Sequence, residues 1–212
     1  YRVDLVGNVT MMGEAEDIDV HKLLGTRANV TMDVQDRKRE FNAFVVKMQR
    51  GERHGRYEAF TMIMRPWLWF ATKTRNSKVF QNKSVKDIVT DVLTPYSTDF
   101  EWRLKMASDY KPLEYCVQYD ETDFDFVSRL LEEAGIYYFF EHTSTKHTMV
   151  LIDAIAKHVS KKTSDPVKWA NSLKHKDTIT NWLMQEEVRS VKATVIDHDY
   201  LATATAIEQN KS

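Results

Sequence analysis

The chain is poor in the residues that mark specialised classes of protein. Its 212 residues include one cysteine, four prolines and six glycines, and 42% of them are hydrophobic. A single cysteine excludes an internal disulfide, which fits folding in a reducing compartment. The small proline and glycine content excludes a collagen-like or low-complexity chain. The composition therefore predicts an ordinary folded protein, with one large domain or two small ones.

An excess of charge of one sign and a long apolar run are also missing. Thirty Lys or Arg against thirty-one Asp or Glu give a formal charge of -1, far from the basic balance of a dedicated nucleic-acid binder, so we expect no nucleic-acid partner. The longest apolar stretch, near residues 65–71, is much shorter than the ~20 residues that span a bilayer, so no transmembrane segment is expected. The chain begins without Met or a charged-then-apolar leader, which predicts the interior of a longer protein with no export signal.

Catalytic and cofactor motifs are missing as well. The sequence has no G-x-S-x-G, H-E-x-x-H, G-x-x-x-x-G-K-[ST], G-x-G-x-x-G or C-x-x-C pattern. Cys116 is expected to be a buried, inert thiol. His142 and His147 flank a hairpin turn and are expected to be solvent-exposed tips rather than metal ligands. Glu132 and Glu133 belong to the solvated face of a helix. We therefore predict no catalytic residue, no cofactor and no metal.

The first 75 residues show the two-residue period of half-buried β-strands. Ala28, Val30, Met32 and Val34 alternate with polar residues, so one face of this strand is predicted to be wet. Strands are expected at residues 1–5, 28–34, 41–48 and 60–64, with a helical turn at 19–24, a polar turn at 36–39 and a connection at 51–55. Strands joined by such short turns predict an antiparallel barrel or sandwich.

The pattern changes after residue 80. Ser84 with Asp87 predicts the start of a short amphipathic helix that ends before Pro95. Thr122 with Asp125 predicts a second helix, which Gly135 ends in a left-handed conformation. Residues 136–142 and 147–153 should then pair as a hairpin. Cys116 belongs to an expected strand, and residues 156–177 are expected to be a long solvated excursion. Alternation returns at residues 191–195, and the residues from 201 onward predict no particular structure.

Two local features allow alternative interpretations. Asp36–Lys78 carries a net charge of +7 and Glu114–Glu141 a net charge of -7; these regions either face each other, within a chain or between subunits, or are simply solvated faces. Trp67, Trp69 and Phe70 form an aromatic cluster that is either a glycan- or base-stacking platform or a plug in the core or at a subunit interface. The Asn-x-Ser/Thr sequons at residues 8, 29 and 82 are expected to carry no role.

Three stretches carry a family resemblance. Residues 65–70 (RPWLWF), 79–89 (VFQNKSVKDIV) and 115–142, from YCVQY through FDFVSRLLEE to GIYYFFEH, resemble the VgrG family of bacterial type VI secretion spike proteins. The similarity is nearly continuous from Asp17 to Asp153 and resumes more weakly from Ile179 to Tyr200. Asn82 departs from it, since the family usually has Asp there, and residues 154–177 do not resemble the usual linker.

The resemblance implies the N-terminal hub-like part of such a spike, similar to the baseplate hub of contractile phage tails. The implied fold is mainly β with helical insertions (α+β), with two related antiparallel β-barrel domains. Residues 1–75 would form a first barrel whose start is missing, 76–135 a helical insertion region, and 136–212 a second barrel with an excursion near 154–177.

The resemblance also implies a function without catalysis. The chain would be the structural hub that adapts a hexameric tube to a trimeric needle, with itself (as a homotrimer), the tube protein, and downstream spike and effector domains as partners. It would be assembled in the bacterial cytoplasm and leave by the type VI route. Trp67, Trp69 and Phe70 are then candidate subunit-interface anchors. The alternatives are a phage tail or tailocin baseplate hub, a glycan- or nucleic-acid-binding β module, and a hydrolase that uses Cys116 or the two hairpin histidines.

Overall fold

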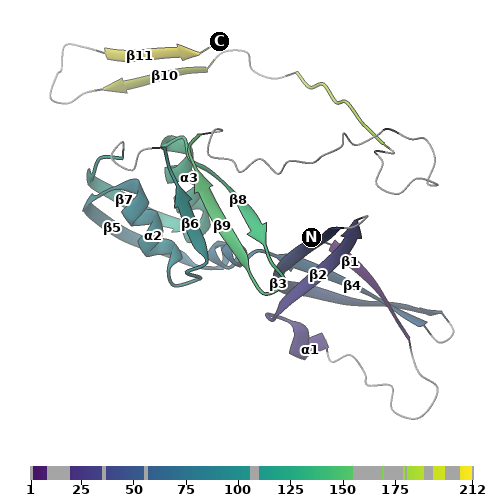
Figure 1. Ribbon diagram of the computed structural model, residues 1–212. Coiled ribbons are helices and arrows are strands. Elements are labelled where there is room, and N and C mark those ends of the chain that lie inside the picture. Colours follow the sequence, from purple (N-terminus) through teal and green to yellow (C-terminus); the bar gives the residue numbers. More distant parts are fainter. Residues whose placement is uncertain are drawn as a thin grey trace. The chain divides into compact units, whose positions relative to one another are not determined.

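The computed structural model divides the chain into two compact units, residues 1–164 and 165–212. The residues that it describes are 2–8, 20–34, 37–54, 57–105, 110–154, 169, 179, 181–188, 193–198 and 206–211. The first unit contains two regions, an N-terminal sheet and a central region in which helices pack on strands (Figure 1).

The N-terminal sheet, which we call the first sheet, is antiparallel and has the strand order β1-β4-β3-β2. Its strands are β1 (Arg2–Asn8), β2 (Arg27–Val34), β3 (Arg37–His54) and β4 (Tyr57–Arg65), and the short helix α1 (Val20–Leu23) precedes β2. All four expected strands and the helical turn are thereby confirmed. Side chains at alternate positions on β3 and β4 form a small buried cluster of Ala43, Val45, Met62 and Met64, and the partly buried Ala28 and Val30 of β2 pack against it, as the two-residue period predicts.

Strand β3 is longer than its sequence predicts. The prediction of a connection at residues 51–55 is wrong for residues 51–54, because β3 continues to His54. A register shift against β4 between Arg50 and Arg53 accommodates the extra residues. Gly51 fits this site because a Cβ there would lie 3.2 Å from the backbone oxygen of Ala59. The polar turn is also shorter than expected, since Arg37 already pairs with Val34.

The first sheet is open over the part of the chain that the structure describes. Strands β1 and β2 form its two edges, and no closed barrel is present among those residues. The fold is therefore mainly β with helices, as expected, and the first sheet supplies an open, antiparallel layer.

The central region begins with the 3-10 helix η1 (Trp67–Lys73) and contains helices α2 (Val85–Leu93) and α3 (Asp123–Glu133). Its strands are β5 (Arg75–Lys83), β6 (Phe100–Arg103), β7 (Leu113–Thr122), β8 (Tyr137–His142) and β9 (His147–Ile152). Strands β5 and β7 pair with each other, and β6, β9 and β8 form a second sheet. Fifteen buried side chains from η1, both helices, β7, β9 and the residue before β8 make one continuous core.

Side-chain caps set the first residues of α2 and α3 at the positions that the sequence predicts. Oγ of Ser84 accepts a hydrogen bond from the backbone N–H of Asp87 at 3.2 Å, and the Asp87 carboxylate accepts one from the backbone N–H of Ser84, which completes a capping box. Oγ1 of Thr122 accepts from the backbone N–H of Asp125 at 3.0 Å. Gly135 follows α3 with φ +67°. The predicted starts of α2 and α3 and the left-handed end of α3 are confirmed.

The predicted hairpin forms from β8 and β9, with Tyr137 opposite Ile152 and His142 opposite His147. The backbone N–H of Thr143 donates to the carbonyl of Lys146 across the turn at 2.8 Å. Strand β6 pairs with β9 in parallel, with Phe100 opposite Met149. This parallel strand is absent from the sequence-based prediction because its four residues lie some fifty positions from their partners and carry no clear period.

The second unit contains an antiparallel pair, β10 (Ala193–His198) and β11 (Ala206–Lys211). Strand β10 confirms the alternation predicted near residues 191–195, whereas β11 lies in the segment from residue 201 onward, for which the sequence predicts no particular structure. Trp169 and Ile179 form an isolated parallel bridge. The rest of the predicted excursion at 156–177 lies outside the described residues. None of the described helices has the length and apolar character needed to cross a membrane.

Candidate functional site

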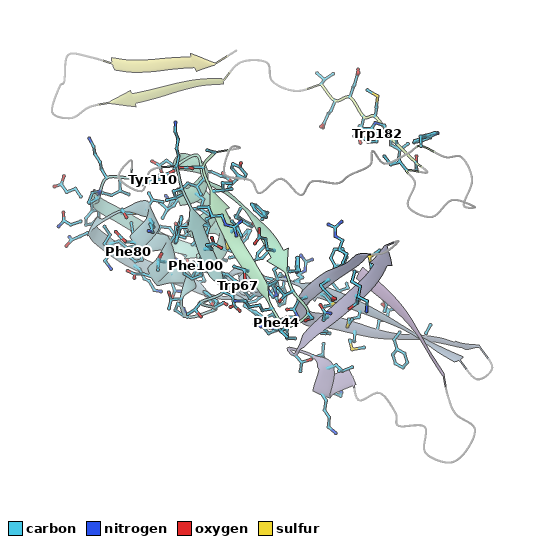
Figure 2. The ribbon with its side chains drawn as sticks, in the orientation of Figure 1. Phe44, Trp67, Phe80, Phe100, Tyr110 and Trp182 are labelled. Carbon is cyan, nitrogen blue, oxygen red and sulfur yellow. The ribbon has the colours of Figure 1, made fainter. Side chains whose placement is uncertain are left out.

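Polar groups gather where the first sheet meets the central region, at a site that we call the histidine joint. It consists of Asn42 on β3, His142 and His147 on the β8–β9 hairpin, and the backbone N–H of Trp67 at the start of η1. Figure 2 labels Trp67 and Phe44, which mark the two sides of this joint. The joint connects segments about one hundred residues apart in sequence.

The hydrogen bonds of the joint fix the state of the His147 ring. The backbone N–H of Trp67 donates to Nε2 of His147 at 2.9 Å, so Nε2 carries no proton. The proton of the neutral ring is therefore on Nδ1, which lies 3.1 Å from the side-chain oxygen of Asn42 and donates to it. The first N–H of η1 belongs to the backbone donors that a helix start leaves without an internal partner, and His147 satisfies it.

Asn42 is held on both sides by the hairpin. Its side-chain amide donates to the backbone oxygen of Ser144, and its own backbone carbonyl lies 2.9 Å from Nδ1 of His142. The backbone N–H of Asn42 lies 3.2 Å from the same nitrogen, so Nδ1 of His142 donates to the carbonyl in one tautomer and accepts from the N–H in the other. Each polar group of Asn42 thus contacts the hairpin, which locks β3 to the β8–β9 turn.

Burial and neighbouring charge keep His147 neutral. Its side chain is 0% exposed, and burial, followed by the charges of Arg27 and His142, lowers its pKa to about 4. Burial also lowers the pKa of His142. The prediction that both histidines are solvent-exposed tips is wrong, because the hairpin turn packs against β3, which leaves His147 buried and His142 half-buried.

Aromatic rings and ion pairs surround the polar centre of the joint. Phe44 meets His147 and Phe70 edge to face, with ring centroids 5.9 and 5.3 Å apart. The Arg27 guanidinium lies 5.1 Å above the Phe44 ring and 3.5 Å from the Asp99 carboxylate. Lys146 contacts the same carboxylate. The aromatic shell explains the strong burial of the joint, and the ion pairs close its rim.

The aromatic cluster predicted as an interface divides into two parts. Trp67 is 1% exposed and belongs to the core of the central region, so its ring contacts the chain's own side chains. Trp69 and Phe70 are half-buried. Trp69 contacts Phe70 edge to face and carries the Lys73 ammonium 4.6 Å from its ring centre. Trp69 and Phe70 therefore retain surface for a partner, and Trp67 anchors η1.

The other residues that the sequence analysis considered lie where it predicts. Cys116 is buried, as predicted, and burial raises the pKa of its thiol. Glu132 and Glu133 are exposed, which confirms the solvated helix face. Among the described residues, no group of three or more His, Cys, Asp or Glu side chains is placed to hold a metal ion.

A second buried polar centre, which the sequence analysis did not identify, surrounds Asp123. This carboxylate is 3% exposed and accepts hydrogen bonds from Gln118, Asn76 and Tyr96 at 2.7, 2.8 and 2.6 Å. Burial raises the pKa of Asp123, but these three donors together bring it below its usual value. The Asp123 centre ties β5, β7 and the segment after α2 to the start of α3, where a helix N-terminus favours a negative charge.

The sequence offers a weak signal for each buried polar centre. Asn42 interrupts an otherwise apolar stretch of β3, between Phe41 and Ala43. Asp123 directly follows the capping residue Thr122. Neither signal identifies a partner, because the groups that satisfy Asn42 and Asp123 come from distant segments.

Comparisons with known proteins place this architecture in a family. The model of the phage tail baseplate hub (GPD) family matches residues 3–212. The Pseudomonas aeruginosa type VI secretion system spike protein VgrG1b is 34% identical over 203 residues, which cover 93% of this chain and 27% of that protein. VgrG1c of the same organism is 37% identical over 192 residues, with 88% and 26% covered. The chain thus spans about a quarter of the length of these curated relatives.

A solved structure shares the fold. The E. coli c3393 protein, described as a component of the type VI secretion system with structural similarity to the T4 tail proteins gp27 and gp5, superposes with a TM-score of 0.59 at 22% identity. The match covers 73% of this chain and 42% of that one. Because the family model spans nearly the whole sequence, this chain belongs to the phage tail baseplate hub family, and type VI secretion spike proteins are among its relatives.

Proposed function

We propose that this chain is the structural hub of a type VI secretion puncturing spike and adapts a hexameric tube to a trimeric needle. The observation that carries the proposal is the match of the baseplate hub model to residues 3–212, together with spike relatives that are more than 30% identical over most of the chain. The relatives named above are spike proteins, and the polar centres described here have structural partners. The hub acts through shape and burial and not through a reactive group.

The histidine joint suggests how the hub withstands force. A contracting sheath would push the tube against the hub, and the hub would pass this push to the needle. The first sheet has a small core of its own, so its connection to the central region must carry the push between them. His147, Asn42 and the Trp67 backbone form that connection through hydrogen bonds that are shielded from water, where each bond is electrostatically stronger.

The proposed architecture is two related antiparallel β-barrels with a helical insertion. Residues 1–75 form the first barrel, 76–135 the insertion region and 136–212 the second barrel, with an excursion near 154–177. The four strands of the open first sheet would be strands of the first barrel. Within residues 136–212 the structure describes two antiparallel strand pairs, β8–β9 and β10–β11, each in its own unit.

The assembly is proposed to be a homotrimer, with Trp69 and Phe70 as anchors of a subunit seam. Their partial exposure and the burial of the neighbouring Trp67 in the core support this role, since interface anchors are often aromatic residues. The tube protein and downstream spike and effector domains are the other partners. The hub assembles in the bacterial cytoplasm and leaves by the type VI route.

A hub exchange tests the proposal. Residues 1–212 replace the matching segment of VgrG1b in a secreting strain, and release of tube protein into the medium is measured, with native mass spectrometry of the purified full-length chimera. We expect a trimer and restored release. A full-length protein that is monomeric or a stable dimer would contradict the hub role. A chimera with a destabilised core, Trp67→Ala, is the control.

A phage tail or tailocin baseplate hub is the second candidate, because the matching family model is described as a phage tail hub. The same chimera distinguishes the two, since a phage hub would form trimers but would not restore type VI release. A glycan- or oligonucleotide-binding module is a third candidate. Titration of the chain with glycans or single strands, followed by tryptophan fluorescence, would reveal binding, and we expect no change.

A further inference from the structure

The hydrogen bond between His147 and η1 exists in only one protonation state of the ring. Nε2 of His147 accepts from the backbone N–H of Trp67 at 2.9 Å, whereas a protonated imidazole has a donor on both nitrogens. Acid therefore sets one N–H against another at the start of η1. Nδ1, by contrast, donates to the Asn42 side chain in both states. The start of η1 is the contact of the histidine joint that protonation breaks.

The His147 ring is held too tightly to turn away from η1. It is 0% exposed, and its Nδ1 stays bonded to Asn42. Three further rings lie 5.9, 5.8 and 5.9 Å from its centroid, and these are Phe44, Phe140 and His142. The clash between the two N–H groups is therefore relieved by movement of η1 and not by rotation of the ring.

The charges around the ring compensate a proton on it only weakly. The charged and titratable groups that face the joint from β2, β3, β8, the hairpin turn and the segment before β6 are Arg27, Arg39, Glu40, His142, Lys146 and Asp99. Most of them are basic. Asp99 already lies 3.5 Å from two of these cations, and Glu40 accepts hydrogen bonds from Asn29 and Thr31. A positive charge on His147 is therefore better stabilised once the joint has opened to water.

The short helix η1 connects this contact to the half-buried aromatic pair. A 3-10 helix has three residues per turn, so the side chains of Trp67 and Phe70 lie one above the other. Phe70 meets Phe44 edge to face with ring centroids 5.3 Å apart, and Trp69 meets Phe70 at 5.5 Å. Loss of the Trp67 hydrogen bond therefore frees the turn of η1 that carries Trp69 and Phe70.

We infer that protonation of His147 releases the start of η1 and exposes Trp69 and Phe70, so that acid controls the proposed subunit seam. His147 is in this respect a positioning residue, because it contacts the backbone of η1 while the two aromatic rings form the seam. The inference rests on the proposed function, from which the seam comes. It adds a residue outside the seam that regulates it.

The size of the effect follows from proton binding to the closed and the open joint. The pKa of His147 is about 4 in the closed joint and returns to its ordinary value of 6.5 when the ring is exposed. The open joint therefore binds more protons, and the ratio of open to closed joints should rise roughly twentyfold from pH 7 to pH 5. Hydrogen exchange of the Trp67 amide, corrected for the intrinsic effect of pH, measures this ratio. A constant ratio would overturn the inference.

Fluorine NMR of the 212-residue chain, labelled with 5-fluorotryptophan, tests the release of η1. The resonance of Trp69, assigned with Trp69→Phe, is followed from pH 7 to pH 4, and its shift between H2O and D2O reports the exposure of the ring. The His147 ring is titrated over the same range. We expect Trp69 to become more exposed with the midpoint at which His147 gains its proton, between pH 4 and pH 6.5. Trp182, in the other unit, is the internal reference and should not change.

Two matched variants assign the change to one ring. His147→Gln keeps an acceptor for the Trp67 N–H but gains no proton, so Trp69 should keep its neutral-pH exposure down to pH 4. His142→Gln removes the neighbouring titratable ring, which contacts Asn42, and should behave as the parent does. Circular dichroism confirms the fold at each pH. If His147→Gln does not fold, the coincidence of the two midpoints in the parent chain still decides.

Four results would overturn the inference: a Trp69 resonance that stays constant while His147 titrates, the same change in His147→Gln, its loss in His142→Gln, or unfolding of the chain before His147 is protonated. The hub role is tested separately, because the hub exchange is measured at neutral pH. Restored release with an acid-insensitive Trp69 would overturn this inference alone. A monomeric chimera with an acid-sensitive Trp69 would contradict the hub role and support the release of η1.

Discussion

The first sheet and the central region bury their apolar side chains in different ways. The central region buries fifteen residues of its described part in one core from two helices, η1 and strands. The described residues of the first sheet form a buried cluster of four, two of them methionines. A single sheet has only one face to bury and gains little without a covering layer. The first sheet therefore depends on its neighbours, and the histidine joint, with the Arg27–Asp99 ion pair and the Phe44–Phe70 contact around it, links it to the central region.

The largest loss of stability should come from a substitution of Trp67, which belongs to the central core and donates its backbone N–H to His147. Trp67→Ala removes a fully buried ring from the central core, and we expect a loss of roughly 3–5 kcal/mol in the free energy of unfolding. Trp182→Ala, at a tryptophan that is mostly exposed, should change it by less than about 0.5 kcal/mol. Urea denaturation measures both. Equal losses would show that the central core is not the main source of stability.

A smaller loss is expected from Gly135→Val, at the exit of α3 toward the hairpin. Gly135 has φ +67° and nothing within 4 Å of an added Cβ, so the change introduces backbone strain without a clash. A β-branched residue in this conformation should cost roughly 1–3 kcal/mol. Gly135→Asn is the matched control and should cost less, since Asn tolerates the left-handed region. Thermal unfolding compares them, and equal melting temperatures for parent and Val variant would contradict the assignment.

Acid should loosen the joint before it affects the central core. The folded-state pKa of His147, about 4, lies below its ordinary value of 6.5, so the unfolded chain binds more protons between these values. The contribution of His147 is complete above pH 6.5 and declines as the pH falls toward 4, with a loss of about 2 kcal/mol by pH 5.

The measurement is urea denaturation at pH 7 and pH 5, with hydrogen exchange to locate the change. Exchange should rise first at the start of η1 and in the β8–β9 hairpin, since the Trp67 N–H loses its acceptor when Nε2 of His147 is protonated, whereas Nδ1 still donates to Asn42. His147→Gln should flatten this pH dependence and lower stability at pH 7. A variant with the same pH dependence as the parent would assign the effect to other groups.

The smallest effects should stay within the central region. Ser84→Ala and Thr122→Ala each remove a helix cap and should cost about 1 kcal/mol. Ser128→Ala, in the middle of α3, should be neutral or slightly stabilising because alanine is the better helix former. Hydrogen exchange should change near the starts of α2 and α3 and not in β2 or β3. A change in the first sheet would show that the two regions are coupled more tightly than the joint implies.

Local signals in the sequence predicted much of the fold. The caps at Ser84 and Thr122, the left-handed end at Gly135 and the β8–β9 hairpin depend on residues within a few positions of one another, so the sequence specifies them directly. Alternation predicted the strands of the first sheet for the same reason. Gly51 misled the prediction, because a glycine at a close backbone approach inside a strand has the same one-letter signal as a glycine in a turn.

The histidine joint and the Asp123 centre were decided by tertiary structure alone. His147 is a buried, neutral acceptor only because Trp67, 80 residues away, presents its first helical N–H to it, and Asn42 reaches it from a separation of 105 residues. Strand β6 likewise pairs with β9 across a long separation. A sequence pattern records the polarity of a residue, but the partner that makes burial of a polar group favourable exists only after the chain has brought distant segments together.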